Sequence, residues 1–239
     1  MVLGLTCAVV VPALDEEASL PLVLADLPRE VDRVVVVDNG SCDGTARVAR
    51  EAGAEVVREP RRGYGSACLK GLAVLAAAPP DVVVFVDADY SDHPDELGRV
   101  VAPIAAGEAD LVIGSRMLGE REPGALLPQA RLGNALACTL VALLYGHRYT
   151  DLGPFRALRW SVIGRLELRD PGFGWTVEMQ VKALRAGIRV AEVPVSYRRR
   201  VGVSKITGTV SGTVKAGAKI LYTVFRYARR ASRGRVKPW

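Results

Sequence analysis

Short apolar runs alternate with longer amphipathic stretches over the first half of the chain. The runs lie at 5–11, 31–37, 54–57, 82–86 and 110–113, and polar or glycine-rich residues follow them. Runs of this length, rich in β-branched residues, are typical of strands buried on both faces of a parallel sheet. The stretches between them are typical of helices. The alternation predicts an α/β fold of three layers around a mainly parallel central sheet.

The pattern changes after residue 116. Residues 117–128 are rich in glycine, proline and charge, which predicts a loop long enough to be a mobile active-site segment. Three helices are expected after it, at 129–145, 175–186 and 209–230, with a short one from Ser161 and a strand over 189–197. The helix at 129–145 is apolar but too short to span a bilayer.

Composition fits a soluble globular chain of 239 residues, with 49% hydrophobic and 24% charged residues. The four cysteines form no C-x-x-C pair and have no histidine cluster near them, so we expect reduced thiols in the cytoplasm. The apolar N-terminus has no basic region before it and is predicted to be a strand, not a signal peptide. No run of 18 apolar residues predicts a transmembrane helix.

The net charge of +6 is unevenly distributed. Residues 193–239 contain 12 Lys or Arg and no Asp or Glu, which leaves 20 basic and 26 acidic residues in the rest of the chain. This asymmetry predicts an anionic partner, a membrane surface or a disordered basic tail. Aromatic residues in this segment are few and no nucleic-acid-binding module is evident, so a nucleic-acid partner is not expected.

The apolar run at 82–86 ends abruptly at Asp87-Ala-Asp89. Ligands bind at the carboxyl ends of strands in open α/β sheets, and residues two apart point the same way in an extended chain. Two adjacent carboxylates favour a cation between them, and oxygen ligands favour Mg²⁺ or Mn²⁺. The alternative is a solvated acidic turn that caps the helix beginning near Pro94.

Acidic residues also follow two other predicted strands. Asp15 and Glu16 follow the first strand, and Asp38 ends the second. Because the carboxyl ends of parallel strands meet at one edge of a sheet, these carboxylates should converge with Asp87 and Asp89 where a nucleotide can lie. Carboxylates accept hydrogen bonds from ribose hydroxyls and base N–H groups, while one of them can hold a metal on a diphosphate.

The order and spacing of these motifs resemble those of family 2 glycosyltransferases with the GT-A fold. The motifs are Pro12-x-x-Asp15-Glu16, Asp38-Asn-Gly-Ser-x-Asp43-Gly-Thr45, Arg62-Gly-x-Gly65, Asp87-Ala-Asp89, Gly114-Ser-Arg116, Asp151-Leu-Gly-Pro-Phe-Arg156, Gly174-Trp-x-x-Glu178 and Arg200-x-Gly-x-Ser-Lys205. They are most similar to the dolichol-phosphate or polyprenyl-phosphate mannosyl- and glucosyltransferase branch. The resemblance covers nearly the whole chain and implies a GT-A catalytic domain over 1–197. Residues 198–239 would then form a basic closing loop and an amphipathic C-terminal helix.

The resemblance implies roles for individual residues. A nucleotide-sugar pocket would be formed by Pro12, Ala13, Asp15, Glu16, Asp38, Gly63, Gly65, Asp87 and Ala88. Asp89 would be the principal ligand of Mg²⁺ or Mn²⁺, with Asp87 beside it. Members of this branch commonly have Gln two residues after the second Asp, as a further ligand; this chain has Ser91 there. Arg116 and Arg131 would neutralise donor diphosphate or acceptor phosphate. Arg200, Ser204 and Lys205 would lie on a flexible segment that closes over the phosphates.

The implied activity is inverting transfer of a hexose from a UDP- or GDP-sugar to a polyprenyl phosphate. A lipid monophosphate is largely dianionic at neutral pH and needs no strong base. A soluble glycan or other hydroxyl acceptor would need one, and Asp151 or Glu178 would be the candidates. A non-catalytic nucleotide-sugar-binding subunit is a third hypothesis. The interleaved apolar and basic residues of 213–227 favour peripheral attachment to the cytoplasmic face of a membrane, with or without a membrane-protein partner.

Overall fold

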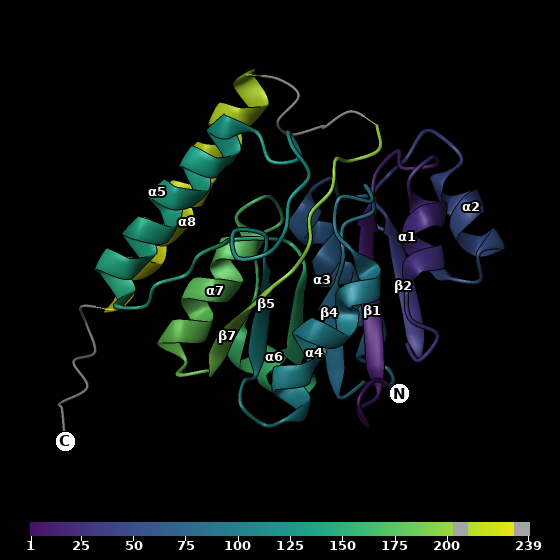
Figure 1. The fold of residues 1–239 in the computed structure, drawn as a ribbon, viewed down its shortest axis with the longest axis horizontal. Coiled ribbons are helices and arrows are strands. Elements are labelled where there is room, and N and C mark those ends of the chain that lie inside the picture. The colour runs from purple at the N-terminus through teal and green to yellow at the C-terminus, as the bar shows by residue number, and fades with distance from the viewer. Residues whose placement is uncertain (203–209, 232–239) are drawn as a thin grey trace.

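A seven-stranded sheet forms the centre of the computed structural model, which describes residues 1–202 and 210–231 (Figure 1). Its strands are β1 (Cys7–Ala13), β2 (Arg33–Asp38), β3 (Glu55–Arg58), β4 (Val82–Phe85), β5 (Leu111–Ser115), β6 (Arg156–Arg159) and β7 (Val190–Pro194). They lie in the order β3-β2-β1-β4-β6-β5-β7. Only β6 runs antiparallel to its neighbours, β4 and β5. The predicted three-layer α/β fold with a mainly parallel sheet is therefore confirmed.

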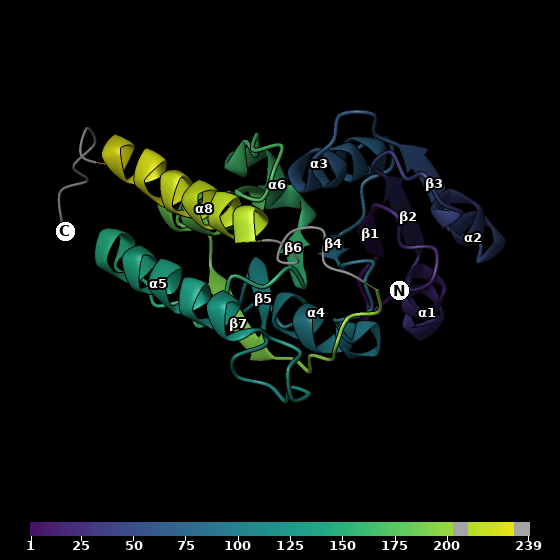
Figure 2. The same ribbon diagram turned by 90° about the horizontal axis from the view of Figure 1, so that it is seen from above.

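Helices cover both faces of the sheet (Figure 2). One face packs on α1 (Leu20–Asp26), α2 (Thr45–Glu51) and α4 (Leu97–Ala105), the last preceded by the 3₁₀ turn η1 (Pro94–Glu96). The other packs on α3 (Tyr64–Leu75), α6 (Trp160–Leu166) and α7 (Trp175–Arg185). Alternate residues of β4 belong to different cores: Val82 and Val84 face one, Val83 and Phe85 the other. The unbroken apolar run is thus explained, since this strand is buried on both faces.

Two long helices, α5 (Pro128–Tyr145) and α8 (Val210–Ala231), lie side by side at one end of the molecule (Figures 1 and 2). The Tyr145 hydroxyl donates to the main-chain oxygen of Val224 at 2.6 Å and joins them. Residues 117–127 contain no helix or ladder strand, as predicted. The last strand was predicted to reach residue 197 but ends at Pro194. Beyond Pro194, Tyr197 instead forms isolated bridges to Asp92 and Arg121.

The register brings the carboxyl ends of the parallel strands to one edge. Ala13 at the end of β1 pairs with Asp38 at the end of β2, and Val10 pairs with Phe85 of β4. The chain then turns sharply, and Asp15 and Tyr90 adopt left-handed backbone conformations with φ of 50° and 63°. No helix within the described residues is long and apolar enough to cross a membrane. The four cysteines are free thiols, and only Cys42 is exposed.

Candidate active site

A cleft of about 380 Å³ opens at this edge of the sheet. It is lined by Pro12, Ala13, Leu14, Glu16, Asn39, Arg62, Gly63, Tyr64, Ala67, Asp87, Ala88, Asp89, Phe173 and Arg200. The lining residues come from the ends of β1, β2 and β4, the start of α3 and the segments before α7 and after β7. Seven of the residues that the sequence pointed to therefore share one cleft with Arg200.

Asp87 lies directly after β4, beside the start of α3. The Tyr64 hydroxyl donates to its Oδ1 at 3.0 Å. Burial, together with the negative charge of Asp89, raises the pKa of Asp87 to about 7. An anionic pair at this position is costly in the absence of a counter-charge, so the site favours a cation.

Asp89 lies in the turn that follows, because the chain leaves its extended path after Asp87. Its Oδ1 accepts hydrogen bonds from the main-chain N–H of Ser91 at 2.9 Å and from the Ser91 hydroxyl at 2.5 Å. Its Oδ2 lies 3.1 Å from Nη1 of Arg200. Nη2 of Arg200 donates to Oε1 of Glu16 at 3.3 Å. Ser91 is buried and its hydroxyl donates its hydrogen bond to Asp89, so in this arrangement it orients that carboxylate.

Asp92 is a third acid here that the sequence analysis did not select. It is buried, and its Oδ2 accepts the main-chain N–H of Asp87 at 3.4 Å. Its Oδ1 has no hydrogen-bond partner among the described residues. Burial and the charges of Asp87 and Asp89 raise its pKa well above the usual range. The signal that could have revealed it was its place directly after Ser91, in the same turn.

The chemistry of these side chains fits a divalent cation bound together with a substrate phosphate. Within the described ranges, no group of three or more His, Cys, Asp or Glu is arranged to enclose a metal ion by itself. Mg²⁺ is usually held by one or two carboxylates plus substrate phosphates, and does not need an all-protein cage. Asp87 and Asp89 supply such a pair of carboxylates. In this structure the guanidinium of Arg200 provides positive charge next to Asp89.

Asn39 is a second residue that the sequence analysis did not single out. Its Nδ2 donates to the main-chain oxygens of Glu59 and Arg61 at 3.0 and 2.9 Å, and its Oδ1 accepts the N–H of Gly63 at 2.7 Å. It therefore fixes the loop that leads into α3 and forms one wall of the cleft. Its neighbour Asp38, which was predicted to line the nucleotide pocket, is buried, lines neither hollow and accepts the N–H of Ser41 at 2.8 Å.

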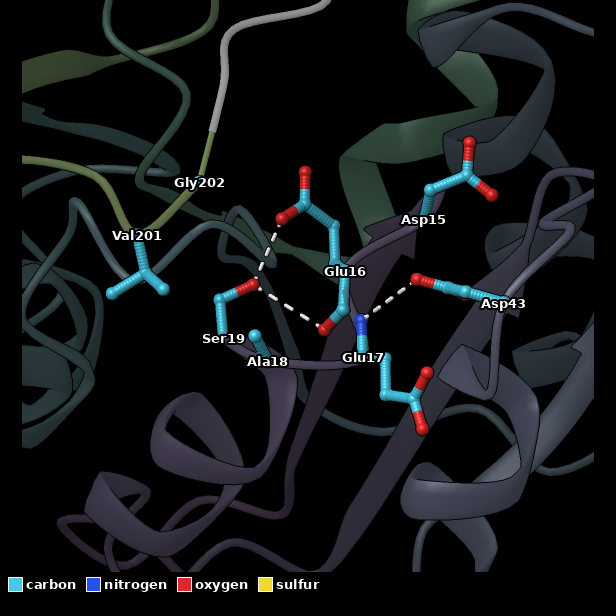
Figure 3. A pocket seen from close by; sticks show the side chains of 8 residues that line it. All are labelled: Asp15, Glu16, Glu17, Ala18, Ser19, Asp43, Val201 and Gly202. Atoms are coloured by element: carbon cyan, nitrogen blue, oxygen red, sulfur yellow. Dashed lines mark hydrogen bonds between the residues drawn. The ribbon is translucent and has the colours of Figure 1, made fainter.

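A second hollow, of about 470 Å³, adjoins the first at Glu16 (Figure 3). It is lined by Asp15, Glu16, Glu17, Ala18, Ser19, Asp43, Val201 and Gly202. The Ser19 hydroxyl donates to Oε2 of Glu16 at 2.8 Å, and the N–H of Glu17 donates to Oδ2 of Asp43 at 3.2 Å. Asp15 lines this second hollow and not the main cleft, whereas Glu16 lines both.

Arg116 and Asp151 form a buried ion pair. Nε and Nη2 of Arg116 donate to the two carboxylate oxygens of Asp151, both at 2.8 Å. The guanidinium also lies 5.0 Å from the ring centroid of Tyr197. Asp151 is fully buried and lines neither hollow, so the structure gives it the role of holding Arg116. This geometry does not suit the role of general base for which the sequence made it a candidate.

Glu178, the other candidate base, is also fully buried away from both hollows. It accepts the Tyr227 hydroxyl at 2.5 Å and the N–H groups of Arg169 and Asp170, and pairs with Lys182 at 2.8 Å. These contacts attach α8 to α7 and to the segment before it. The geometry therefore assigns Glu178 a structural part.

The remaining predicted residues lie in different surroundings. Arg131 is exposed on α5 and lines neither hollow. At Gly65 a Cβ atom would lie 2.0 Å from the main-chain oxygen of Asp170, so glycine there permits close packing of α3. Ser204 and Lys205 lie outside the described residues.

The sheet and the acidic residues around a cleft at the carboxyl ends of its strands define an α/β protein of the Rossmann-like class, in which ligands bind at that edge. Residues 8–162 match the model of glycosyl transferase family 2, and the chain belongs to this family. It is 41% identical over 216 residues to an uncharacterized glycosyltransferase of Mycobacterium tuberculosis, covering 89% of this chain and 95% of the relative. Undecaprenyl-phosphate mannosyltransferase of Micrococcus luteus is 33% identical over 220 residues, covering 85% and 88%.

The fold is similar to that of glucosyl-3-phosphoglycerate synthase from Mycobacterium tuberculosis, solved with Mn²⁺, UDP and glucosyl-3-phosphoglycerate. The TM-score is 0.75 at 26% identity, covering 95% of this chain and 81% of the other. The predicted GT-A class and the predicted glycosyltransferase activity are both confirmed by these likenesses. The chain is a family 2 glycosyltransferase.

Proposed function

We propose that this glycosyltransferase moves a hexose from a nucleoside-diphosphate sugar to a polyprenyl phosphate, with Mg²⁺ or Mn²⁺ as cofactor. The observation that carries the proposal is the cluster of Asp87, Asp89 and Glu16 around the Arg200 guanidinium in one cleft. Paired carboxylates next to a cationic group suit a metal-bound diphosphate. The Mn²⁺ and UDP of the glucosyl-3-phosphoglycerate synthase structure support the same donor class.

The polyprenyl phosphate acceptor is supported by the name of the Micrococcus luteus relative and by the chemistry of the site. A phosphate monoester with a second pKa of about 6 is mostly dianionic at neutral pH. It can attack the anomeric carbon without giving up a proton to a base. The burial of Asp151 and Glu178 in ion pairs agrees with an acceptor that needs no such base.

The proposed reaction is a single displacement with inversion. An acceptor phosphate oxygen forms a bond to the anomeric carbon as the bond to the donor diphosphate oxygen breaks. Asp87 and Asp89 would hold the cation, and Arg200 adds positive charge at the cleft. Arg116, fixed by Asp151, lines neither hollow, but its charge opposes the rise in the pKa of the buried Asp87, and it is the candidate partner of the acceptor phosphate. The bound cation supplies electrostatic stabilisation of the charge that develops on the leaving diphosphate.

The test is a transfer assay with purified protein, Mg²⁺ or Mn²⁺ and a panel of UDP- and GDP-hexoses, run with and without a short polyprenyl phosphate. We expect a glycosyl-phospholipid product only when one donor, the metal and the lipid phosphate are all present. Donor hydrolysis or binding that the lipid leaves unchanged would overturn the lipid acceptor. The same panel identifies the base and the sugar.

A soluble acceptor is the second candidate, and the likeness to glucosyl-3-phosphoglycerate synthase favours it. That structure contains glucosyl-3-phosphoglycerate, the glucosylated form of a phosphorylated three-carbon acid. Adding 3-phosphoglycerate and simple glycans to the same panel separates the two candidates. Product formed with a soluble hydroxyl compound in the absence of lipid would favour this alternative.

A further inference from the structure

The helix pair α5–α8 projects from the layered part of the fold (Figures 1 and 2). α5 packs on α7 and α8, and α8 packs on α5 and α7. Among the described residues, neither helix contributes one to the cleft or to the hollow beside it. The function proposed for the cleft therefore leaves the outer faces of this pair unexplained.

The outer face of α5 carries large apolar side chains in contact with solvent. Leu132, Leu136 and Leu143 are 73%, 49% and 76% exposed. Their spacing of four and seven residues places them on one face of the helix. The opposite face, with Ala137 and Cys138, is buried. Contiguous apolar surface of this kind on a soluble domain marks a site of interaction.

The described part of α8 adds aromatic side chains that are flanked by cations. Tyr222 and Phe225 are 56% and 46% exposed. Nζ of Lys219 and Cζ of Arg226 lie 5.6 and 6.0 Å from the centroid of the Tyr222 ring. Aromatic rings next to basic groups are typical of helices that lie in the interface of a bilayer, with their long cationic side chains in the headgroup region.

The charge of the helices α5 and α8 indicates what kind of partner covers their outer faces. The sequences of α5 and α8 contain no Asp or Glu, whereas they contain Arg131, Lys215, Lys219, Arg226, Arg229 and Arg230. A second copy of the same pair would bring like charges together without any acidic partner, which is unfavourable. An anionic lipid surface instead attracts the exposed Arg226, whereas Lys219 already pairs with the buried Asp170 at 2.8 Å.

We propose that the outer faces of α5 and α8 dock this protein on an anionic lipid bilayer, with both helices in the plane of the interface. The leucines and aromatic rings enter the boundary between headgroups and acyl chains, and the guanidinium of Arg226 contacts the lipid phosphates. In the part of the chain that the structure describes, neither helix is long and apolar enough to span the bilayer. The inference uses no residue of the cleft, so it stands or falls separately from the acceptor proposed above.

The test is co-sedimentation of the full chain with vesicles of phosphatidylcholine alone or with added phosphatidylglycerol, free of polyprenyl phosphate. We expect binding to the phosphatidylglycerol vesicles that weakens with salt. Combined Leu132→Gln, Leu136→Gln and Leu143→Gln should reduce the affinity at least about tenfold. Arg226→Gln should reduce it about fivefold. Leu3→Gln with Leu22→Gln is the matched control, because these leucines are exposed elsewhere, and it should bind like wild type.

Unchanged vesicle binding by the leucine variant, or a wild-type chain that stays in the supernatant with phosphatidylglycerol, would overturn the proposal. Size-exclusion chromatography without lipid tests the competing occupant. A wild-type dimer that the three leucine substitutions convert to a monomer would assign the surface to a second copy. Circular dichroism of each variant shows whether it is folded, and Arg226→Gln tests the same surface without altering its apolar part.

Discussion

At the scale of the residue, acidic side chains divide into two groups by what surrounds them. Asp87 and Asp89 lie in the cleft and have like-charged neighbours that make a cation favourable there. Asp151 and Glu178 are fully buried and have their oxygens taken by protein donors. Sequence position alone does not separate the groups, because Arg116, which holds Asp151, is 35 residues away, and Tyr227, one of the partners of Glu178, is 49 residues away.

Asp151→Asn tests the structural role of that carboxylate. The substitution leaves the buried guanidinium of Arg116 without its counter-charge, so we expect a loss of about 3–5 kcal/mol in the free energy of unfolding. Burial opposes the charged form of Asp151, but the charge and hydrogen bonds of Arg116 outweigh it and lower its pKa. Its contribution is therefore present above the ordinary pKa of about 4 and is lost as pH falls through the lowered value.

Urea unfolding of the wild type and the variant between neutral and acidic pH measures both effects. The difference between the two proteins should be largest near neutrality and shrink in acid. Asp95→Asn is the matched control, because Asp95 is largely exposed, and it should change the free energy of unfolding by no more than about 0.5 kcal/mol. Equal stability of Asp151→Asn and wild type at neutral pH would contradict the role given to the ion pair.

At the scale of the element, the segment before α7 joins the cleft to α8. Its Asp170 pairs with Lys219 of α8 at 2.8 Å, and the main-chain oxygen of Pro171 accepts the N–H of Ser66 in α3 at 2.9 Å. Phe173 of the same segment lines the cleft. This segment therefore contacts α8, α3 and the cleft at once.

Tyr227→Phe tests how α8 is held. The hydroxyl that it removes donates to the buried carboxylate of Glu178 at 2.5 Å, so we expect a loss of about 1.5–3 kcal/mol in the free energy of unfolding. Tyr222→Phe on the exposed side of the same helix should change it by less than about 0.5 kcal/mol. Urea denaturation compares the two variants. If both lose the same amount, the Glu178 contact does not hold the helix.

Gly65→Ala tests the packing of α3 against the same segment. The added Cβ atom would lie 2.0 Å from the main-chain oxygen of Asp170 and 2.9 Å from Cβ of Trp175, so backbone must shift. We expect a loss of about 1–3 kcal/mol in stability and a higher KM for the donor, because α3 carries Tyr64 into the cleft. Gly164→Ala in α6 has open space around it and should instead stabilise by about 0.5–1 kcal/mol. Thermal unfolding and donor titration measure these effects; a neutral Gly65→Ala would contradict the close packing.

At the scale of the whole molecule, the fold follows from apolar runs whose period and length are local properties of the sequence. The positions of Asp15, Glu16, Asp87 and Asp89 followed from the rule that parallel strands end at one edge. What could not be predicted depends on turns and long-range contacts. Asp92 and Asn39 act through the conformation of the loops that contain them, and Arg131 is exposed near the start of α5, which packs on α7 and α8.

The proposed sugar transfer in the cleft and the proposed docking of α5 and α8 on a lipid surface are compatible in one molecule. A donor cleft at the sheet edge and a helix pair with an apolar, basic exterior are the two parts that a transferase acting at a lipid surface needs. Each can be tested separately, since vesicle binding involves α5 and α8 and turnover involves the cleft. Agreement of both results would establish an enzyme that meets its acceptor at the membrane.

The measurement that tests the central claim most directly is metal-dependent sugar transfer by Asp89→Asn beside Asp95→Asn and wild type. The first substitution removes a charge from the cleft and the second removes one from an exposed site a few residues away. We predict that Asp89→Asn loses at least about a hundredfold in kcat, as expected when electrostatic stabilisation of the transition state is removed, while remaining folded. Asp95→Asn should keep full activity. Wild-type turnover by Asp89→Asn at saturating Mn²⁺ would contradict the assignment of this cleft as the active site.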